Sequence, residues 1–262
     1  MGLHQNNIAL IFAIISLLIV GFTYLGLLFV NPNHFVFFCN DDSIRYPLKP
    51  ETVNSALCTI LNIVLVLLIV CCTEFLYYRL YGASIVWGNH IKFNPLFITI
   101  LYYLFCIFYG LLITLALSQI AKVTVGRLRP NFIALCKPDW TKINCSKPVS
   151  DPHCTVKLNK EAPLSFPSAH ASSLFYSAFA LCIYLRRRIV HPSVNFLAHS
   201  IQIGIFALAI WVSLTRISDY WHHSTDVLSG AVLGSLIGII TTYCISFPHK
   251  SREDKTFRSV SN

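Results

Sequence analysis

Long apolar runs alternate with short polar segments along the whole chain, and their length gives the first structural prediction. A helix of about 20 residues crosses the roughly 30 Å hydrocarbon core of a bilayer. Runs near or above this length cover residues 8–30, 56–78, 95–120, 165–185, 196–214 and 227–247. The pattern therefore predicts an all-α polytopic membrane protein, with six transmembrane helices in a single domain over residues 1–262.

The order of the runs also predicts which connecting segments share a face of the membrane. An even number of crossings places both termini on one side and the segments 31–54, 121–164 and 215–226 on the other. The arginine triplet at 186–188 and the charged tail 248–262 are expected on the cytoplasmic side, where basic residues are enriched. The first run has no Lys or Arg before it and no small-residue cleavage pattern after it, so we expect a retained helix.

The composition excludes a soluble domain. Of the 262 residues, 55% are hydrophobic and only 12% are charged, and the mean hydropathy is +0.62. A soluble domain of this size needs more polar surface than this chain supplies. The net charge is +9, but the basic residues are dispersed between the apolar runs, so we expect no nucleic-acid partner.

One acid stands inside the second apolar run. Glu74 lies close to its end, where Arg79 follows. A side chain in this position can keep its stem in the apolar layer and extend its charged group to water. We therefore expect Glu74 to be an interfacial carboxylate.

The cysteines indicate disulfides and no metal site. The ten cysteines show no paired metal-ligand spacing. Four of them fall in the predicted loops, at Cys39, Cys136, Cys145 and Cys154, which suits disulfides in an oxidising compartment. Their spacing leaves the pairing open.

The longest polar loop also carries a glycosylation acceptor pattern. Asn144-Cys145-Ser146 matches Asn-x-Ser, which is modified in loops that face the lumen or the cell exterior. Together with the loop cysteines, this pattern favours a lumenal or extracellular position for the loop.

Basic residues follow the third run. Lys122 and Arg129 are seven positions apart, which is two helical turns, and Pro130 ends a helix. Both cations are therefore expected to project from one face of the helix and to bind the oxygens of one anion. The alternative is that they anchor lipid headgroups or complement the helix dipole.

A second polar group opens the fourth run. Pro167 and the small residues Ser168 and Ala169 precede His170. The first N–H groups of a helix have no partner within it, so this start predicts an anion site. His170 is then either functional or an interfacial structural residue.

A third polar group fills the segment 215–226 between the last two runs. It contains Arg216, His222 and Asp226, which have no packing role in so apolar a chain. If the segment is helical, His222 and Asp226 share one face, and the carboxylate can hold one ring nitrogen while the other acts as a nucleophile or base. The alternative is a polar turn at the membrane surface.

Alternation of the six runs places these three groups at one membrane face. The combined site would offer three cations, helix-start N–H donors, two histidines and one orienting acid. The cations and donors suit a phosphate dianion and the additional charge of its transition state. One histidine would attack phosphorus, and the other would protonate the leaving alkoxide.

The same residues resemble a known family. Three segments look like the signature motifs of the type 2 phosphatidic acid phosphatase superfamily, which also includes vanadium haloperoxidases. They are Lys122-x6-Arg129-Pro130, Pro167-Ser168-Ala169-His170 and Arg216-x5-His222-x3-Asp226. Within that superfamily, the segments 39–47, 126–130 and 218–223 resemble animal lipid phosphate phosphatases. The resemblance covers nearly the whole chain. It implies a haloperoxidase-like helical core with six transmembrane helices, an outward-facing site and no metal or other cofactor.

The resemblance also assigns roles by motif position. His222 resembles the nucleophile that forms a phosphohistidine, Asp226 its orienting partner and His170 the general acid. His223 is the rival nucleophile, and the motif spacing favours His222. The residues that resemble the phosphate cradle are Lys122, Arg129, Ser168, the Ala169 backbone and Arg216.

Two positions depart from the family pattern, and no reacting group is lost. Ala169 replaces the usual Gly, which restricts the backbone that offers its N–H. Thr215 replaces the usual Ser and keeps the hydroxyl.

The predicted function is metal-independent hydrolysis of lipid phosphate monoesters at an extracellular or lumenal face, with phosphatidate, lysophosphatidate, sphingosine 1-phosphate and ceramide 1-phosphate as the implied substrates. We expect an integral protein of the plasma membrane with cytoplasmic termini. Its expected partners are its lipid substrates, and the sequence leaves open whether it forms a homo-oligomer. The alternatives are a polyprenyl diphosphate phosphatase, a lipid phosphotransferase and a non-catalytic lipid-phosphate scaffold. Retention of both His222 and His170 is difficult to explain in a scaffold.

Overall fold

The computed structural model describes residues 3–30, 36–81, 94–157, 160–189 and 192–244. This part of the chain contains seven α-helices, one 3-10 turn and no strand. The elements are α1 (Leu3–Phe29), η1 (Asp42–Ile44), α2 (Ser55–Tyr81), α3 (Pro95–Val125), α4 (Phe132–Cys136), α5 (Ala169–Arg188), α6 (Pro192–Ser218) and α7 (Ser224–Cys244). The predicted all-α class is confirmed.

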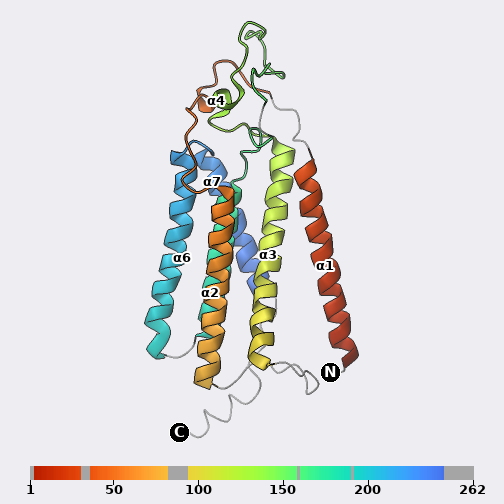
Figure 1. The fold of residues 1–262 in the computed structure, drawn as a ribbon, viewed down its shortest axis with the longest axis vertical. Coiled ribbons are helices and arrows are strands. Elements are labelled where there is room, and N and C mark those ends of the chain that lie inside the picture. Colours follow the sequence, from red (N-terminus) through yellow and green to blue (C-terminus); the bar gives the residue numbers. More distant parts are fainter. Residues whose placement is uncertain (1–2, 31–35, 82–93, 158–159, 190–191, 245–262) are drawn as a thin grey trace.

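The long helices lie side by side in one bundle (Figure 1). The connecting segments that contain α4 gather at one end of the bundle, which we call the α4 end, and the first residues of α1 lie at the opposite end. The helices α1, α2, α3, α6 and α7 are long and apolar enough to cross a membrane. The predicted count of six spans is not confirmed, because α5 is not among these five candidates.

The helix α5 differs from the others because neighbouring helices enclose it. It contacts α2, α3, α6 and α7. Its buried residues include the hydroxyl side chains of Ser172, Ser173 and Ser177, which lower its hydropathy relative to a lipid-facing span. The predicted run 165–185 therefore corresponds to the central helix of the bundle.

Three glycines of α7 allow α5 and α7 to approach closely. A Cβ atom added at Gly230 or Gly234 would lie 2.4 or 2.0 Å from the carbonyl oxygen of Ser168 or Ser172. At Gly238 the corresponding distance to a carbonyl oxygen of α5 is 2.8 Å. Small residues at four-residue spacing permit this backbone contact between helices. The packing fixes the start of α5 against the start of α7.

The third run ends as a helix earlier than predicted. Gly126 adopts a left-handed conformation with φ of 61° directly after Val125, and its N–H donates to the Lys122 carbonyl. Glycine takes this conformation without a Cβ clash and commonly ends a helix. The prediction that Lys122 and Arg129 project from one face of a continuous helix is therefore wrong.

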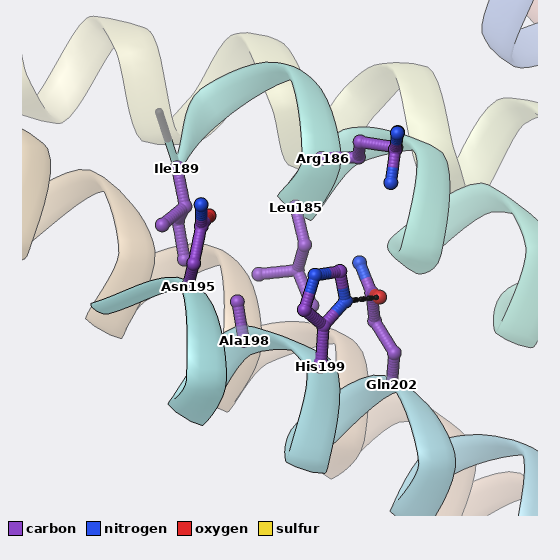
Figure 2. A pocket seen from close by; sticks show the side chains of 7 residues that line it. All are labelled: Leu185, Arg186, Ile189, Asn195, Ala198, His199 and Gln202. Carbon is purple, nitrogen blue, oxygen red and sulfur yellow. Dashed lines mark hydrogen bonds between the residues drawn. The ribbon is translucent and has the colours of Figure 1, made fainter. Parts of the chain in front are cut away.

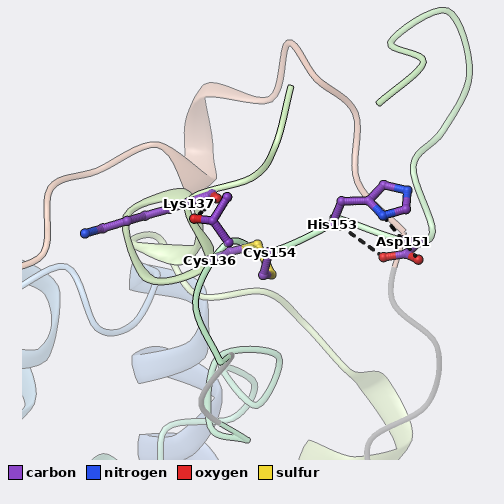
Figure 3. The surroundings of a disulfide bond; sticks show 6 residues. Cys136, Lys137, Asp151, His153 and Cys154 are labelled. Atoms are coloured by element: carbon purple, nitrogen blue, oxygen red, sulfur yellow. Dashed lines mark hydrogen bonds and ion pairs between the residues drawn. A yellow bond between two sulfur atoms is a disulfide. The ribbon is translucent and has the colours of Figure 1, made fainter. Parts of the chain in front are cut away.

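Two disulfides organise the α4 end. Cys39 pairs with Cys145, and Cys136 pairs with Cys154, as Figure 3 shows for the second bond. The expectation of loop disulfides is confirmed, and the structure supplies the pairing that the sequence left open. The loop also contains the short helix α4, whose Phe132 is fully buried in a second small core that the sequence did not predict.

The expectation for Glu74 is wrong. Its carboxylate is 1% exposed and accepts hydrogen bonds from Arg188 Nε and Nη2 at 2.7 and 2.6 Å and from the Tyr184 hydroxyl at 2.8 Å. The Arg188 guanidinium also lies over the Tyr77 ring, 3.7 Å from its centroid. A paired and hydrogen-bonded carboxylate can remain buried, whereas an isolated one has to reach water. This ion pair joins α2 to the last turn of α5.

We predict that Glu74→Gln lowers the stability of the protein, because it leaves the Arg188 charge unpaired. Breaking a buried ion pair by removing one partner typically costs about 3–5 kcal/mol. Thermal unfolding in detergent should show a clearly lower midpoint than that of the wild type. The pair Lys142 and Asp139, whose side chains are 66% and 27% exposed, gives the control, and Asp139→Asn should change the midpoint much less than Glu74→Gln. Equal midpoints for Glu74→Gln and wild type would contradict the prediction.

Candidate active site

The three polar groups predicted from the sequence come together at the α4 end of the bundle. They are supplied by the end of α3 with the segment after it, the start of α5, the end of α6, the turn before α7 and the start of α7. The site residues with buried side chains are Lys122, Arg129, Ser168, Arg216, His222 and Asp226. We call this group, with Ala169 and His170, the candidate active site.

His222 lies in the turn between α6 and α7 and is held by a backbone carbonyl. Its Nδ1 atom lies 2.7 Å from the Ser165 carbonyl oxygen. A carbonyl oxygen only accepts, so we infer that Nδ1 carries the proton and that Nε2 keeps its lone pair. Burial lowers the pKa of His222 well below its usual value, and the charges of Arg129 and Lys122 lower it further. At neutral pH the imidazole is therefore uncharged, as a nucleophile requires.

Asp226 does not hold the His222 ring as the sequence predicted. The prediction assumed one helix through both residues, but α7 begins at Ser224, and the shortest distance from His222 Nδ1 to Asp226 is 3.9 Å. The carboxylate instead accepts from Ser165 Oγ at 2.6 Å, Arg127 Nη1 at 2.5 Å and the His223 N–H at 3.0 Å. Asp226 thus joins segments that carry all three sequence motifs.

Lys122 and Arg129 meet at one carboxylate even though they do not share a helix. Lys122 Nζ lies 3.8 Å and Arg129 Nη2 lies 2.8 Å from the same Glu161 oxygen, Oε2. The Arg129 Nε atom also donates to the Glu161 backbone carbonyl at 2.8 Å. The two cations can therefore bind one anion, as predicted, and in this structure the carboxylate of Glu161 is such an anion.

Arg216 is the most enclosed cation of the site. Its side chain is 1% exposed, and it donates from Nη1 to Glu51 at 2.8 Å and from Nη2 to Asp219 at 3.1 Å. Its Nε atom is buried and has no hydrogen-bond partner within the described part of the chain. Two carboxylates thus fix the guanidinium while one donor remains for a ligand.

Two further buried polar atoms of the site have no hydrogen-bond partner among the described residues. They are Ser168 Oγ and His170 Nε2, at the start of α5. Burial, and after it the charges of Arg216, Lys122 and Arg129, lower the pKa of His170. Buried polar atoms normally have partners, so these atoms are suited to the oxygens of a bound ligand.

The two backbone N–H groups predicted to bind an anion at this helix start differ from each other. The Ser168 N–H donates to the Asp226 backbone carbonyl at 3.0 Å. The next residue, Ala169, is the first residue of α5, where N–H groups have no partner within the helix.

His223, the rival nucleophile, is turned toward the backbone that follows α3. Its Nε2 atom lies 3.1 Å from the Leu128 carbonyl oxygen. Burial and the charge of Arg127 lower the pKa of His223. This contact distinguishes His223 from His222, whose Nδ1 lies against the Ser165 carbonyl oxygen.

The segment before α2 forms hydrogen bonds with the end of α6 and with the turn that follows it. Thr52 donates from its N–H and hydroxyl to Asp219 at 2.8 and 3.0 Å. Lys49 donates from Nζ to the Ser218 carbonyl, and its own carbonyl accepts from Trp221 Nε1, both at 3.1 Å. The segment thereby fixes the turn that carries His222.

Sequence reasoning missed several residues that contact the site, namely Glu51, Arg127, Glu161 and Ser165. Arg127 and Ser165 had a signal, because each stands within or beside one of the three motifs. Glu51 and Glu161 had none, because each lies in a polar loop whose path the sequence does not give.

Two cavities border α6 and share no residue with the candidate active site. An apolar cavity of about 410 Å³ lies between α2, α5 and α6. A second, of about 290 Å³, lies between the end of α5 and the first turns of α6, where His199 Nδ1 is 3.1 Å from Gln202 Oε1 (Figure 2). Arg186 and Asn195 also line this cavity, so its lining is partly polar. Among the described residues, no group of three or more His, Cys, Asp or Glu side chains is placed to hold a metal ion.

The described residues form a helical bundle in which the buried cations Lys122, Arg129 and Arg216 and the buried His222 gather at the α4 end. The PAP2 superfamily domain matches residues 103–250, which include every residue of the candidate active site. Human phospholipid phosphatase 2 is 34% identical over 253 residues, covering 91% of this chain and 83% of the relative. Mouse phospholipid phosphatase 1 is 36% identical over 212 residues, covering 80% and 74%. No solved structure matches the chain.

The chain therefore belongs to the PAP2 superfamily and, within it, to the phospholipid phosphatases. It is a phosphatase with membrane-crossing helices.

Proposed function

We propose that this protein hydrolyses lipid phosphate monoesters, such as phosphatidate, lysophosphatidate, sphingosine 1-phosphate and ceramide 1-phosphate, through a phosphohistidine and without a metal ion. The observation that carries the proposal is His222, a buried uncharged imidazole whose Nδ1 is bonded to the Ser165 carbonyl. The charges of Arg129 and Lys122 add to burial in keeping this ring uncharged. The names of the relatives support a phospholipid substrate.

In the first step, the His222 Nε2 lone pair attacks phosphorus, and the bond from phosphorus to the ester oxygen breaks. His170 gives its Nε2 proton to the leaving alkoxide, which departs as the lipid alcohol. A bound phosphate dianion favours the protonated form of a nearby imidazole, so substrate binding prepares His170 for this role. Lys122, Arg129 and Arg216 stabilise the charge on the phosphoryl oxygens.

In the second step, water attacks the phosphohistidine. His170 takes a proton from the water, the bond from phosphorus to His222 breaks, and inorganic phosphate is formed. The His222 ring is then uncharged again. A phosphotransferase would share the first step and use an alcohol in place of water, and a polyprenyl diphosphate phosphatase would differ in its leaving group.

Activity is expected to survive chelation of divalent ions, because three cations already supply the charge that a metal would provide. The purified protein should release inorganic phosphate from each of the four lipid monophosphates in EDTA, and vanadate should inhibit it. Absence of phosphate release would favour a non-catalytic lipid-phosphate scaffold. Loss of turnover in EDTA that Mg²⁺ restores would make Asp219, His222, His223 and Asp226 candidate metal ligands.

We also propose that the α4 end faces the cell exterior or the lumen, with the plasma membrane as the location and with cytoplasmic termini. Asn144 is exposed at this end, beside the disulfide of Cys145. Glycosidase treatment should increase the mobility of the wild type in gel electrophoresis and leave that of Asn144→Gln unchanged. A tag in the loop 131–164 that becomes accessible only after permeabilisation of the plasma membrane would contradict this orientation.

A further inference from the structure

The carboxylate of Glu161 contacts two cations of the proposed phosphate cradle, Lys122 and Arg129. Glu161 Oε2 accepts from Arg129 at 2.8 Å and lies 3.8 Å from Lys122 Nζ. Both cations have side chains that are 8% exposed, whereas the Glu161 side chain is 49% exposed. A solvent-accessible acid thus compensates two buried cations.

We propose that Glu161 is an internal competitor for phosphate: its carboxylate occupies the position of a phosphate oxygen in the empty site, is displaced by the substrate and returns when product phosphate leaves. This inference rests on the proposed function. It assigns to the reaction a residue that none of the three sequence motifs contains.

Two other acids of the site, Asp219 and Asp226, are more deeply buried than Glu161. Asp219 is held by the Thr52 N–H and hydroxyl as well as by Arg216. Asp226 is fully buried and accepts three hydrogen bonds. These two acids are parts of the framework, whereas Glu161 has a path to solvent.

The balance of cations and carboxylates in the site gives Glu161 a role both before substrate binds and when product leaves. The site holds four side-chain cations, Lys122, Arg127, Arg129 and Arg216, and four carboxylates, Glu51, Glu161, Asp219 and Asp226. Buried cations without an anion would be unfavourable in the empty enzyme. The same cations would retain the product dianion strongly if no group competed for them.

The effect on affinity follows from the open fraction of the site. A ligand that binds only the open state has an apparent Kd equal to the intrinsic Kd divided by the open fraction. If Glu161 covers the cations about 90% of the time, its removal lowers the apparent Kd about tenfold. The Arg129 Nε bond to the Glu161 backbone carbonyl remains in Glu161→Gln, so this variant isolates the carboxylate.

The experiment compares Glu161→Gln with wild type and with Asp151→Asn. Asp151 lies in the same loop, and its carboxylate pairs with His153 (Figure 3), so the control removes one negative charge without touching the cradle. Inhibition by inorganic phosphate and by vanadate should be about tenfold stronger in Glu161→Gln and unchanged in Asp151→Asn. Without ligand, Glu161→Gln should unfold at a lower temperature than wild type, and added phosphate should reduce the difference.

Equal or weaker phosphate and vanadate binding by Glu161→Gln would overturn the inference and make Glu161 a support of Arg129 and Lys122. A lower kcat together with a higher KM for the lipid substrate would do the same. The thermal measurement with inorganic phosphate requires no turnover. A wild type that binds phosphate but releases none from lipid monophosphates would therefore refute the proposed function separately.

Discussion

His222→Ala is expected to abolish turnover of every phosphate monoester, whatever its leaving group. The reason is chemical, because Nε2 of this ring is the atom that forms the bond to phosphorus. No acid-labile phosphoenzyme should be trapped from this variant after mixing with labelled substrate. His223→Ala is the matched control, since that ring bonds to the Leu128 carbonyl and should retain most of the activity. Equal loss in both variants would contradict the assignment of the nucleophile.

His170→Ala separates proton donation from bond formation. General acid catalysis is typically worth about 10² to 10⁴ in rate. We expect a loss of this size on lipid phosphates, whose alkoxides are poor leaving groups, and partial recovery on an aryl phosphate, whose phenolate leaves without a proton. His222→Ala should not recover on either substrate. An equal loss on lipid and aryl phosphates would instead make His170 a phosphate-binding or structural residue.

The parts of the fold that follow from local sequence could be predicted. Five of the six apolar runs are helices apolar enough to span a membrane, because length and hydropathy determine that property. The run at 165–185 is different, since α5 is covered by four neighbouring helices and can carry hydroxyl side chains that lipid would disfavour. Its role as the central helix depends on tertiary packing.

The features that could not be predicted depend on contacts between residues far apart in the sequence. The partner of Glu74 is Arg188, 114 positions later, and no local pattern joins them. The Cys39 to Cys145 pairing likewise depends on the path of two loops. In the site, the order of the runs indicated that Lys122, Arg129 and His222 come together, and the structure places them at one end of the bundle. Their predicted geometry was wrong, because α3 ends before Gly126 and because His222 lies in the turn before Ser224 rather than in a helix with Asp226.

Asp226→Asn is expected to lower kcat about 10²-fold by displacing His222, although the two side chains make no direct hydrogen bond. Asp226 is fully buried and accepts from Arg127, Ser165 and the backbone that follows His222. An asparagine removes the charge opposite Arg127 and presents an NH₂ group where only acceptors fit. A displacement of about 1 Å in a reacting group can cost about 10² in rate.

The comparison with Ser165→Ala shows whether Asp226 acts through the framework or directly on the ring. Ser165→Ala removes one hydroxyl bond to Asp226 but keeps the backbone carbonyl that holds His222 Nδ1, so its kcat should fall less than about tenfold. Neither variant removes a cradle cation, so inhibition by inorganic phosphate should stay near that of wild type in both. If Asp226 bonded to the ring during the reaction, Asp226→Asn would favour the wrong tautomer, and kcat would fall by about 10⁴. A measured loss of that size, with phosphate inhibition unchanged, would show that the Ser165 carbonyl holds the ring only in the empty enzyme.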